Sequence, residues 1–409
     1  MKNSRLTRSN RGVGLLAYKR NIDLLILFRM LSACVAFPIS TLVEYWRLAG
    51  LNMTEIMFLE AYFGIILAAM IIPSGYFADL FGRKKSLLIG SLSLLLGIVL
   101  YVSYRSYELF LLAETCLALG FGFISGADDA LLHDSLQELR APNLFRQIKA
   151  KLLRYFFVAV AGVHILGSYI LSDIDLLLPF YAEILGLIAM IISVLCMHEP
   201  RKIKQSSHSF VQLVDATKEL LVRNREVSKI LVVSTALMSL NFSGFWLYQD
   251  YFMACGFERS FNGVFLAMLS LVAGVVTIWF EKKKGSLDII SVFISFSLVS
   301  ALGYFAMASY VGQFSPLFLV LHQFLRVSDE VLLSEKLLQV ARPEFRATAL
   351  SVKGMLFHLV VGFIIVPIGW WSDQFGLLST FYLLSLMTLG SVAGLIMGMK
   401  LLLNRAACS

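Results

Sequence analysis

Long apolar stretches, separated by short polar connections, make up most of the chain. Each stretch is about 20 residues long, and a bilayer core of ~30 Å needs ~20 helical residues to cross it. The pattern therefore predicts twelve membrane-spanning helices. They cover residues 24–43, 56–78, 86–104, 109–133, 152–172, 176–197, 230–249, 260–280, 287–309, 314–334, 347–371 and 377–399.

The amino-acid composition also indicates a membrane protein. Hydrophobic residues make up 58% of the 409 residues and charged residues 15%, against about 45–50% and about 25% in soluble globular chains. These values exclude a soluble enzyme and a disordered chain. The five cysteines show no metal-ligand spacing. We expect an all-α polytopic membrane protein without a soluble domain or cofactor.

The positions of lysine and arginine predict the orientation. With the N-terminus inside, 29 of the 35 basic residues fall on the inner side of the membrane, and cytoplasmic connections carry such an excess. We expect a multi-pass protein of the cell inner (cytoplasmic) membrane, with both termini in the cytoplasm. The net charge of +8 then reflects topology rather than nucleic-acid binding. The first helix has no signal-peptide cleavage site after it and is expected to be retained.

An internal repeat organises the helices. Residues 124–137 (ISGADDALLHDSLQ) match residues 325–339 (LRVSDEVLLSEKLLQ) at an offset of 201, which aligns Asp128 with Asp329 and Asp134 with Glu335. A fixed offset of this kind indicates duplicated structural units. The repeat predicts two six-helix bundles, 1–197 and 230–409, joined by a cytoplasmic linker at 198–229.

The segment GYFADLFGRKK, which begins at Gly75, sits between the second and third predicted helices. It resembles the G-x-x-x-D-x-x-G-R-[RK]-[RK] signature of the major facilitator superfamily, and with the repeat this resemblance covers the whole chain. It implies a secondary transporter of two six-helix repeats that works by alternating access. It also implies a cytoplasmic gate, in which glycines allow close helix contact and Asp79 faces the start of the eleventh helix. The expected gate residues are Gly75, Asp79, Gly82, Arg83, Lys84, Asp134, Arg140, Glu335 and Arg342. Alternatively, the basic run only retains its connection in the cytoplasm.

A substrate site is expected from polar groups deep in the helices. In this superfamily the first, fourth, seventh and tenth helices line the cavity, so by resemblance Arg326 and Arg29 face the solute. Two arginines favour an anionic ligand, because guanidinium pairs bidentately with carboxylate. Alternatively, Arg29 snorkels to the interface and Arg326 pairs with Asp329 or Glu330. The full set of expected substrate-binding residues is Arg29, Asn241, Trp246, Gln323 and Arg326.

Energy coupling requires a group that exchanges a proton inside a low-dielectric cavity. The candidates are Glu114, Asp128, Asp129, His164 and His358. For the two aspartates, an equally weighted alternative is a structural ion cluster with Arg83, Arg146 or Arg154. For the histidines, the alternative is a role in helix packing.

We therefore predict a monomeric, proton-coupled importer of a small organic solute such as an organic acid, amino acid or carboxylate siderophore. Efflux of a drug, metabolite or siderophore by proton antiport is the alternative. It is disfavoured because the drug-efflux branch usually has an arginine near the position of Glu114 and a Gly-Pro hinge in the fifth helix, which residues 158–171 lack. A remoter alternative is a membrane prenyltransferase, because DDALLHD resembles a segment that holds Mg²⁺ and diphosphate.

Overall fold

The computed structural model describes residues 2–200, 218, 221, 225–282, 289–340 and 346–407. Every regular element in these ranges is a helix. The chain divides into two compact units. Unit 1 comprises Met1–Ser40 and Ala69–Ser207, and unit 2 comprises Thr41–Ala68 and His208–Ser409. The six-plus-six division expected from the repeat remains a prediction.

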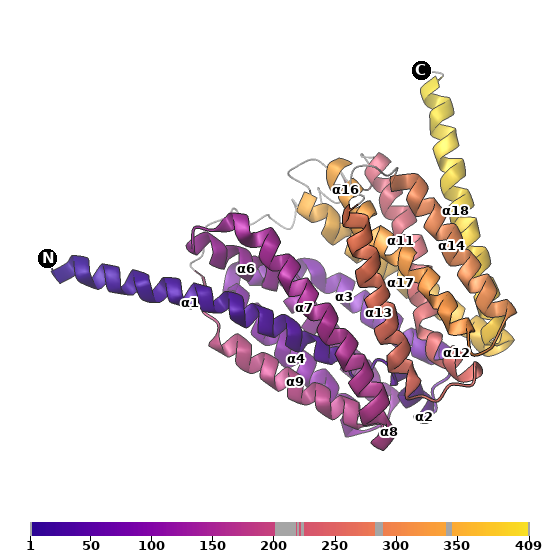
Figure 1. The fold of residues 1–409 in the computed structure, drawn as a ribbon, viewed down its shortest axis with the longest axis horizontal. Coiled ribbons are helices and arrows are strands. Elements are labelled where there is room, and N and C mark those ends of the chain that lie inside the picture. The colour runs from indigo at the N-terminus through magenta and orange to yellow at the C-terminus, as the bar shows by residue number, and fades with distance from the viewer. Residues whose placement is uncertain are drawn as a thin grey trace. The chain divides into compact units, whose positions relative to one another are not determined.

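Unit 1 is built from the first and third to sixth predicted spans (Figure 1). Its elements, including the helix α3 that it shares with unit 2, are α1 (Lys2–Ser32), η1 (Ala33–Ala36), α3 (Met53–Phe81), α4 (Arg83–Ser103), α5 (Tyr107–Ile124), α6 (Ala127–Glu138), η2 (Pro142–Leu144), α7 (Phe145–Ile165), η3 (Leu166–Leu171), α8 (Ser172–Ile174) and α9 (Leu178–Cys196). Helix α4 packs along α5 and α9, while α1 packs along α7 and α9.

Unit 2 contains α2, the start of α3 and every described element from α11 onward. Besides α3, these are α2 (Leu42–Leu48), α11 (Arg225–Trp246), α12 (Tyr248–Ala254), α13 (Phe261–Lys282), α14 (Ile289–Ser309), η5 (Ser315–Phe318), α15 (Leu319–Ser328), η6 (Asp329–Leu333), α16 (Ser334–Val340), α17 (Arg346–Phe375) and α18 (Leu377–Ala407). Helix α11 packs against α17, and α14 packs between α15 and α18.

Nine helices in the described ranges are long and apolar enough to cross a membrane, or ten if the bent pair α11–α12 counts as one span. They coincide with ten of the twelve predicted windows. Window 24–43 does not meet this test of length and composition, because α1 ends at Ser32 and the 3-10 turn η1 follows. Window 314–334 does not meet it because it divides into η5, α15 and η6 and carries several charged side chains. Both windows remain predicted spans.

Helix α3 contains Pro73. Proline has no backbone N–H, so the carbonyl group of residue 69, four positions earlier, has no helical donor. The boundary between the two units falls directly before Ala69. The weakest hydrogen bonding in α3 therefore lies where the chain passes from one unit to the other.

Candidate functional site

The fourth predicted span is broken next to its acidic segment. Helix α5 ends at Ile124 and α6 begins at Ala127, and Gly126 between them has a left-handed φ of 77°. Glycine adopts this conformation without steric cost. The break places Asp128 in the first turn of α6, where its buried carboxylate accepts the N–H of Asp129 at 2.8 Å. The positive end of the helix dipole favours an anion here.

Two cations hold this acidic pair. Arg29 Nε of α1 lies 3.0 Å from Asp128 Oδ2, and its guanidinium lies 5.7 Å from the ring centre of Phe156. Lys149 Nζ of α7 lies 2.5 Å from Asp129 Oδ2. The ion cluster considered as an alternative from the sequence thus exists in unit 1, but with cations that the sequence reasoning did not assign to it.

The repeat-related acid in unit 2 also lies at a helix irregularity. Asp329 begins the π-helical turn η6, and such turns often mark functional positions. Lys353 Nζ of α17 lies 2.7 Å from Asp329 Oδ2 and donates to the Asp329 carbonyl at 3.1 Å and to Ser334 Oγ at 3.0 Å. The hydroxyl of Ser234 on α11 donates to the same carboxylate. Lys353 was missed because an isolated lysine in an apolar window does not reveal its partner.

Arg326 has a different environment. Asp329, its neighbour in sequence, forms an ion pair with Lys353 instead. Glu330 and Tyr248 interact with Arg326 only electrostatically. Within the described residues, Arg326 forms no ion pair or hydrogen bond. This α15 cation thus retains its capacity to bind an anion.

Two other predicted substrate residues of unit 2 carry buried polar atoms without partners among the described residues. The Oε1 of Gln323 and the indole Nε1 of Trp246 are buried without a hydrogen-bond partner among the described residues. Asn241 Nδ2 on α11 makes a long contact of 3.5 Å with the carbonyl of His322 on α15. The four predicted substrate residues of unit 2 therefore lie on α11 and α15, which are in contact.

The signature segment forms a charged turn within unit 1. Arg83 Nη2 lies 2.5 Å from Asp79 Oδ1, and Arg83 Nε lies 3.7 Å from Asp134 Oδ2. Glu199 accepts the backbone N–H groups of Arg83 at 2.8 Å and Lys84 at 2.9 Å, which caps the N-terminus of α4. At the end of α9, the carbonyls of Leu195 and Met197 accept hydrogen bonds from Lys84 Nζ, at 2.8 and 2.7 Å.

Gly82 is required by this turn for two reasons. Its φ is 115°, and a Cβ at this position would lie 2.8 Å from the carboxyl carbon of Glu199. Gly75 differs, because a Cβ there would have no atom within 4 Å. Among the described residues, the close helix contact expected at Gly75 is therefore not found on the side that a Cβ would occupy.

Other gate predictions need correction or lie outside the described residues. Arg140 was expected to complete the cluster of Arg83 and Asp134, but its side chain is exposed and pairs with no described acid. Arg140 lies two residues beyond the end of α6 at Glu138, and its φ is 56°. Glu335 contacts Gln339 at 3.4 Å, whereas Arg342 lies outside the described residues. The contact of Asp79 with the eleventh helix stays a prediction.

Each of the remaining proton-coupling candidates contacts another side chain of its own unit. Glu114 on α5 is buried and accepts the hydroxyl of Tyr101 on α4. His164 Nδ1 lies 3.2 Å from Ser40 Oγ. The ring of His358 packs against Phe357 at a centroid distance of 5.1 Å. The histidine contacts are those expected of packed helices.

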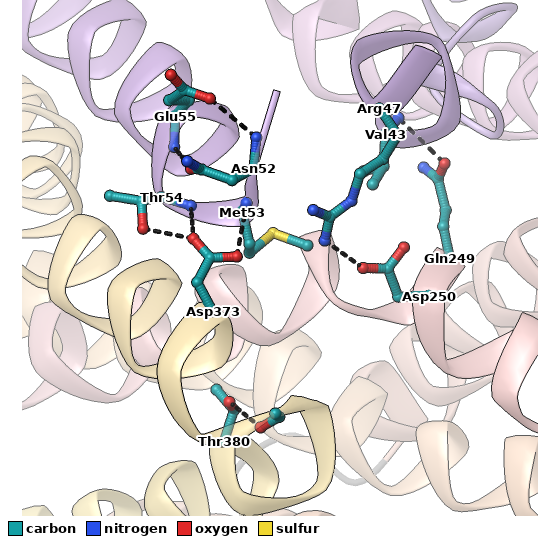
Figure 2. Close-up of polar contacts among 11 residues, drawn as sticks. Val43, Arg47, Asn52, Met53, Thr54, Glu55, Gln249, Asp250, Asp373 and Thr380 are labelled. Atoms are coloured by element: carbon teal, nitrogen blue, oxygen red, sulfur yellow. Dashed lines mark hydrogen bonds and ion pairs between the residues drawn. The ribbon is translucent and has the colours of Figure 1, made fainter. Parts of the chain in front are cut away.

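A second polar network, which we call the latch, lies at the start of α3 in unit 2 (Figure 2). Asp373 at the end of α17 accepts the N–H groups of Met53 at 3.0 Å and Thr54 at 2.7 Å, and the Thr54 hydroxyl at 2.5 Å. Asn52 and Glu55 form a reciprocal capping box with two contacts of 2.9 Å. An acidic side chain from α17 thus holds the positive end of α3.

The latch includes two ion pairs of α2. Arg47 lies 2.9 Å from Asp250 of α12 (Figure 2), and Glu44 lies 3.0 Å from Arg259. Burial raises the pKa of the Glu44 carboxyl above its usual range, although Arg259 opposes this shift. Two of the three basic residues in predicted outer connections, Arg47 and Arg259, are used here. Sequence spacing gave no signal for these pairs, since their members lie about 200 residues apart.

These features describe a polytopic helical protein with buried ion pairs in both units and polar networks at helix ends. The family model described as the Major Facilitator Superfamily matches residues 24–326, which is most of the chain. The protein therefore belongs to the major facilitator superfamily and is a secondary transporter, not an enzyme.

Solved structures show the same fold over nearly the whole chain. The nucleoside transporter NupG is 14% identical, with a TM-score of 0.78 over 92% of this chain and 99% of its own. The POT family transporter PepTSo is 11% identical, with a TM-score of 0.77 over 93% and 98%. A D-xylose-proton symporter is 15% identical, with a TM-score of 0.71 over 93% and 97%. No curated protein matches the chain in sequence.

Proposed function

We propose that this chain imports a small organic anion into the cell across the cytoplasmic membrane and couples this uptake to protons. The observation that carries the proposal is Arg326, a guanidinium in the predicted span 314–334 that has no ion pair or hydrogen bond within the described residues. A charge at this depth is costly unless it has a function or a partner. A carboxylate solute would supply that partner.

The neighbouring polar groups fit such a solute. Arg326 would bind the carboxylate through its planar fork. The indole N–H of Trp246 is a donor and the Gln323 Oε1 is an acceptor, and both are buried without a partner among the described residues. Asn241 adds an amide on the facing helix. These groups would orient the rest of the molecule, and they favour an organic acid or amino acid over an apolar drug.

Arg29 fits the binding role less well in this conformation. Asp128 already neutralises it at 3.0 Å. We propose that the Arg29–Asp128 pair serves coupling, because protonation of Asp128 would release Arg29 toward an anionic solute. A cation paired with a titratable acid in this way links a proton to a negatively charged cargo.

Alternating access requires closures at both ends of the solute pathway, and α3 carries candidates at each of its ends. The latch fixes its first residues, Met53 and Thr54, whereas the signature turn follows its last residue, Phe81. At ~1.5 Å per residue, a helix of these 29 residues is about 40 Å long, enough to reach both faces of a bilayer. We propose that the latch closes the outer side while the charged turn closes the cytoplasmic side.

Proton coupling receives support from a structural neighbour, the D-xylose-proton symporter, which has the same fold. The repeat-related pairs Arg29–Asp128 and Lys353–Asp329 both place an acid against a cation from another helix. We take Asp128 as the leading coupling residue. Both termini lie in the cytoplasm in this proposal, as the distribution of basic residues requires.

The test is uptake by proteoliposomes loaded at alkaline pH and placed in acidic buffer with a panel of radiolabelled organic acids and amino acids. We expect one class to accumulate, and Arg326→Gln to reduce its uptake at least tenfold with normal amounts of protein. Arg326→Lys, which keeps the charge but loses the fork, should retain partial uptake with a raised KM.

A matched control is Arg105→Gln, which removes an exposed arginine from another connection and should leave uptake unchanged. Wild-type uptake by Arg326→Gln would remove Arg326 from the binding site. Accumulation only in vesicles with the opposite proton gradient would instead support efflux.

A further inference from the structure

Two glutamates meet inside unit 1, and only one of them was singled out by sequence reasoning. Glu183 on α9 is fully buried, and Glu114 on α5 is 4% exposed. They are 69 positions apart in sequence, but their carboxyl groups lie close enough to interact electrostatically. Glu183 escaped notice because a single glutamate in the apolar window 176–197 has no motif around it.

Both carboxyl oxygens of Glu183 are buried without a hydrogen-bond partner among the described residues. A carboxylate ion in an apolar interior costs several kcal/mol unless donors or a cation surround it. Within the same residues, neither Glu183 nor Glu114 pairs with lysine, arginine or histidine. Glu183 is thus a carboxyl group whose surroundings favour the neutral, protonated form.

The surroundings of the pair are aromatic. Tyr101 on α4 donates its hydroxyl to Glu114. The Tyr101 ring stacks on Phe110 at 5.2 Å and on Phe180 at 6.0 Å, each about one helical turn before one of the glutamates. Cys34 of η1 is the other titratable group that interacts with Glu183. Helices α4, α5 and α9 thus enclose two acids with one tyrosine donor between aromatic rings.

We propose that Glu114 and Glu183 form a proton-binding site, in which Glu183 holds one proton in this conformation and Glu114 is stabilised by Tyr101. Two carboxylates at close range cannot both be ionised without a cation. When bundle rearrangement admits water, the O–H bond of Glu183 breaks. Its proton then passes to that water, leaving a carboxylate and a hydronium ion.

This inference deepens the proposed function by naming a proton site away from Arg29 and Asp128, and its role in coupling rests on that function. Helices α9 and α4 pack directly on one another, and α1, which carries Arg29, packs on α9. A charge that appears on Glu183 would destabilise this packing. The protonation state of Glu183 would then favour one arrangement of the bundle over another.

The test is infrared difference spectroscopy of the purified full-length protein in lipid nanodiscs, which needs no solute. At neutral pH, we expect the C=O stretching band of a buried protonated carboxylic acid, with a small shift in D₂O. This band should disappear reversibly at alkaline pH. It should be lost in Glu183→Gln and retained in Glu108→Gln, which makes the same chemical change at an exposed position of α5.

Glu114→Gln provides a second test if Glu183→Gln does not fold. It removes the neighbouring acid but leaves Glu183, so the band should remain, shift in frequency and disappear at a lower pH than in the wild type, because the charge that opposes ionisation of Glu183 is gone. An unchanged band in either variant would overturn the inference, as would a wild-type band that persists at every pH at which the protein stays folded. Because uptake is not measured, failure of the anion-import proposal would leave this result intact.

Discussion

Asp128 and Asp329 occupy equivalent positions in the two repeats, but their charges are neutralised in different ways. Asp128 pairs with Arg29 from α1, whereas Asp329 pairs with Lys353 from α17 and accepts a hydroxyl from α11. The acid is thus retained in both repeats while its cation comes from different helices. The ion pair of unit 1 therefore involves the first helix, α1, whereas the ion pair of unit 2 involves α17.

Breaking the first pair tests its structural weight. Asp128→Asn should lower the thermal stability of the purified protein by several degrees, because Arg29 would remain half-buried without its counter-ion. The double variant Arg29→Gln/Asp128→Asn should recover part of this loss, since no unpaired charge remains. Melting in detergent, followed by tryptophan fluorescence, measures both. Additive losses in the double variant would mean that the two side chains are energetically independent.

Individual residues show how far the sequence alone leads. Arg326 and Arg29 could be singled out as candidates because a charge inside an apolar window is visible without a structure. The partner of Arg29, Asp128, was not predicted, and for Arg326 both Asp329 and Glu330 lay about one turn away. Lys353 takes Asp329 only because the π-helical turn η6 and α17 bring the two together. Partner choice depends on tertiary packing, which local patterns do not encode.

Helix α4 shows how a signature motif acts at the level of an element. Its N-terminus is capped by Glu199, which follows α9, rather than by a residue of the motif. The turn therefore joins the beginning of α4 to the end of α9. Gly82 of the motif makes room for this carboxylate. From the sequence alone, we expected the motif glycines to allow helix contact and a tight turn.

Substitution of the two signature glycines separates these roles. Gly82→Ala should destabilise the protein, because a backbone with φ 115° and ψ 150° costs a non-glycine residue ~1–3 kcal/mol and the added Cβ meets Glu199. Gly75→Ala should be neutral or slightly stabilising, because this helical position has open space. Thermal melting of the two variants side by side measures the difference. Equal melting temperatures would show that the turn tolerates a side chain.

At the scale of the whole molecule, the fold class could be predicted because membrane spans are long, apolar and locally encoded. Ten of twelve windows reappear as spans among the described residues, counting α11–α12 once. The latch could not be predicted, because Asp373 and Thr54 are 319 positions apart and each resembles an ordinary polar residue in a connection. Polar networks between residues far apart in sequence can be recognised only once the three-dimensional structure is known.

The latch predicts a pH dependence of outer opening. Because burial raises the Glu44 pKa, the closed latch binds a proton more tightly than the open one. Closure is therefore favoured as pH falls and weakened as pH rises through the raised pKa. Labelling of an introduced Thr54→Cys by a membrane-impermeant maleimide should be faster at higher pH, after correction for the reagent's own pH dependence.

The control for this prediction is Glu44→Gln in the same cysteine background. It removes the titrating group, so the corrected labelling rate should change little with pH. Faster labelling of the Glu44-containing protein at lower pH would contradict the expected direction of the effect. No labelling of Thr54→Cys from outside at any pH would place the latch on the other face of the membrane.

Pro73 gives α3 a property that neither network has alone. A continuous helix fastened at both ends would transmit displacement like a stiff rod, so that release of one end would dislodge the other. The missing hydrogen bond at residue 69 makes the middle of this rod compliant, at the position where the chain passes between units. In the proposed mechanism, each end can then be released while the other stays fastened, so that the solute pathway does not open to both sides at once.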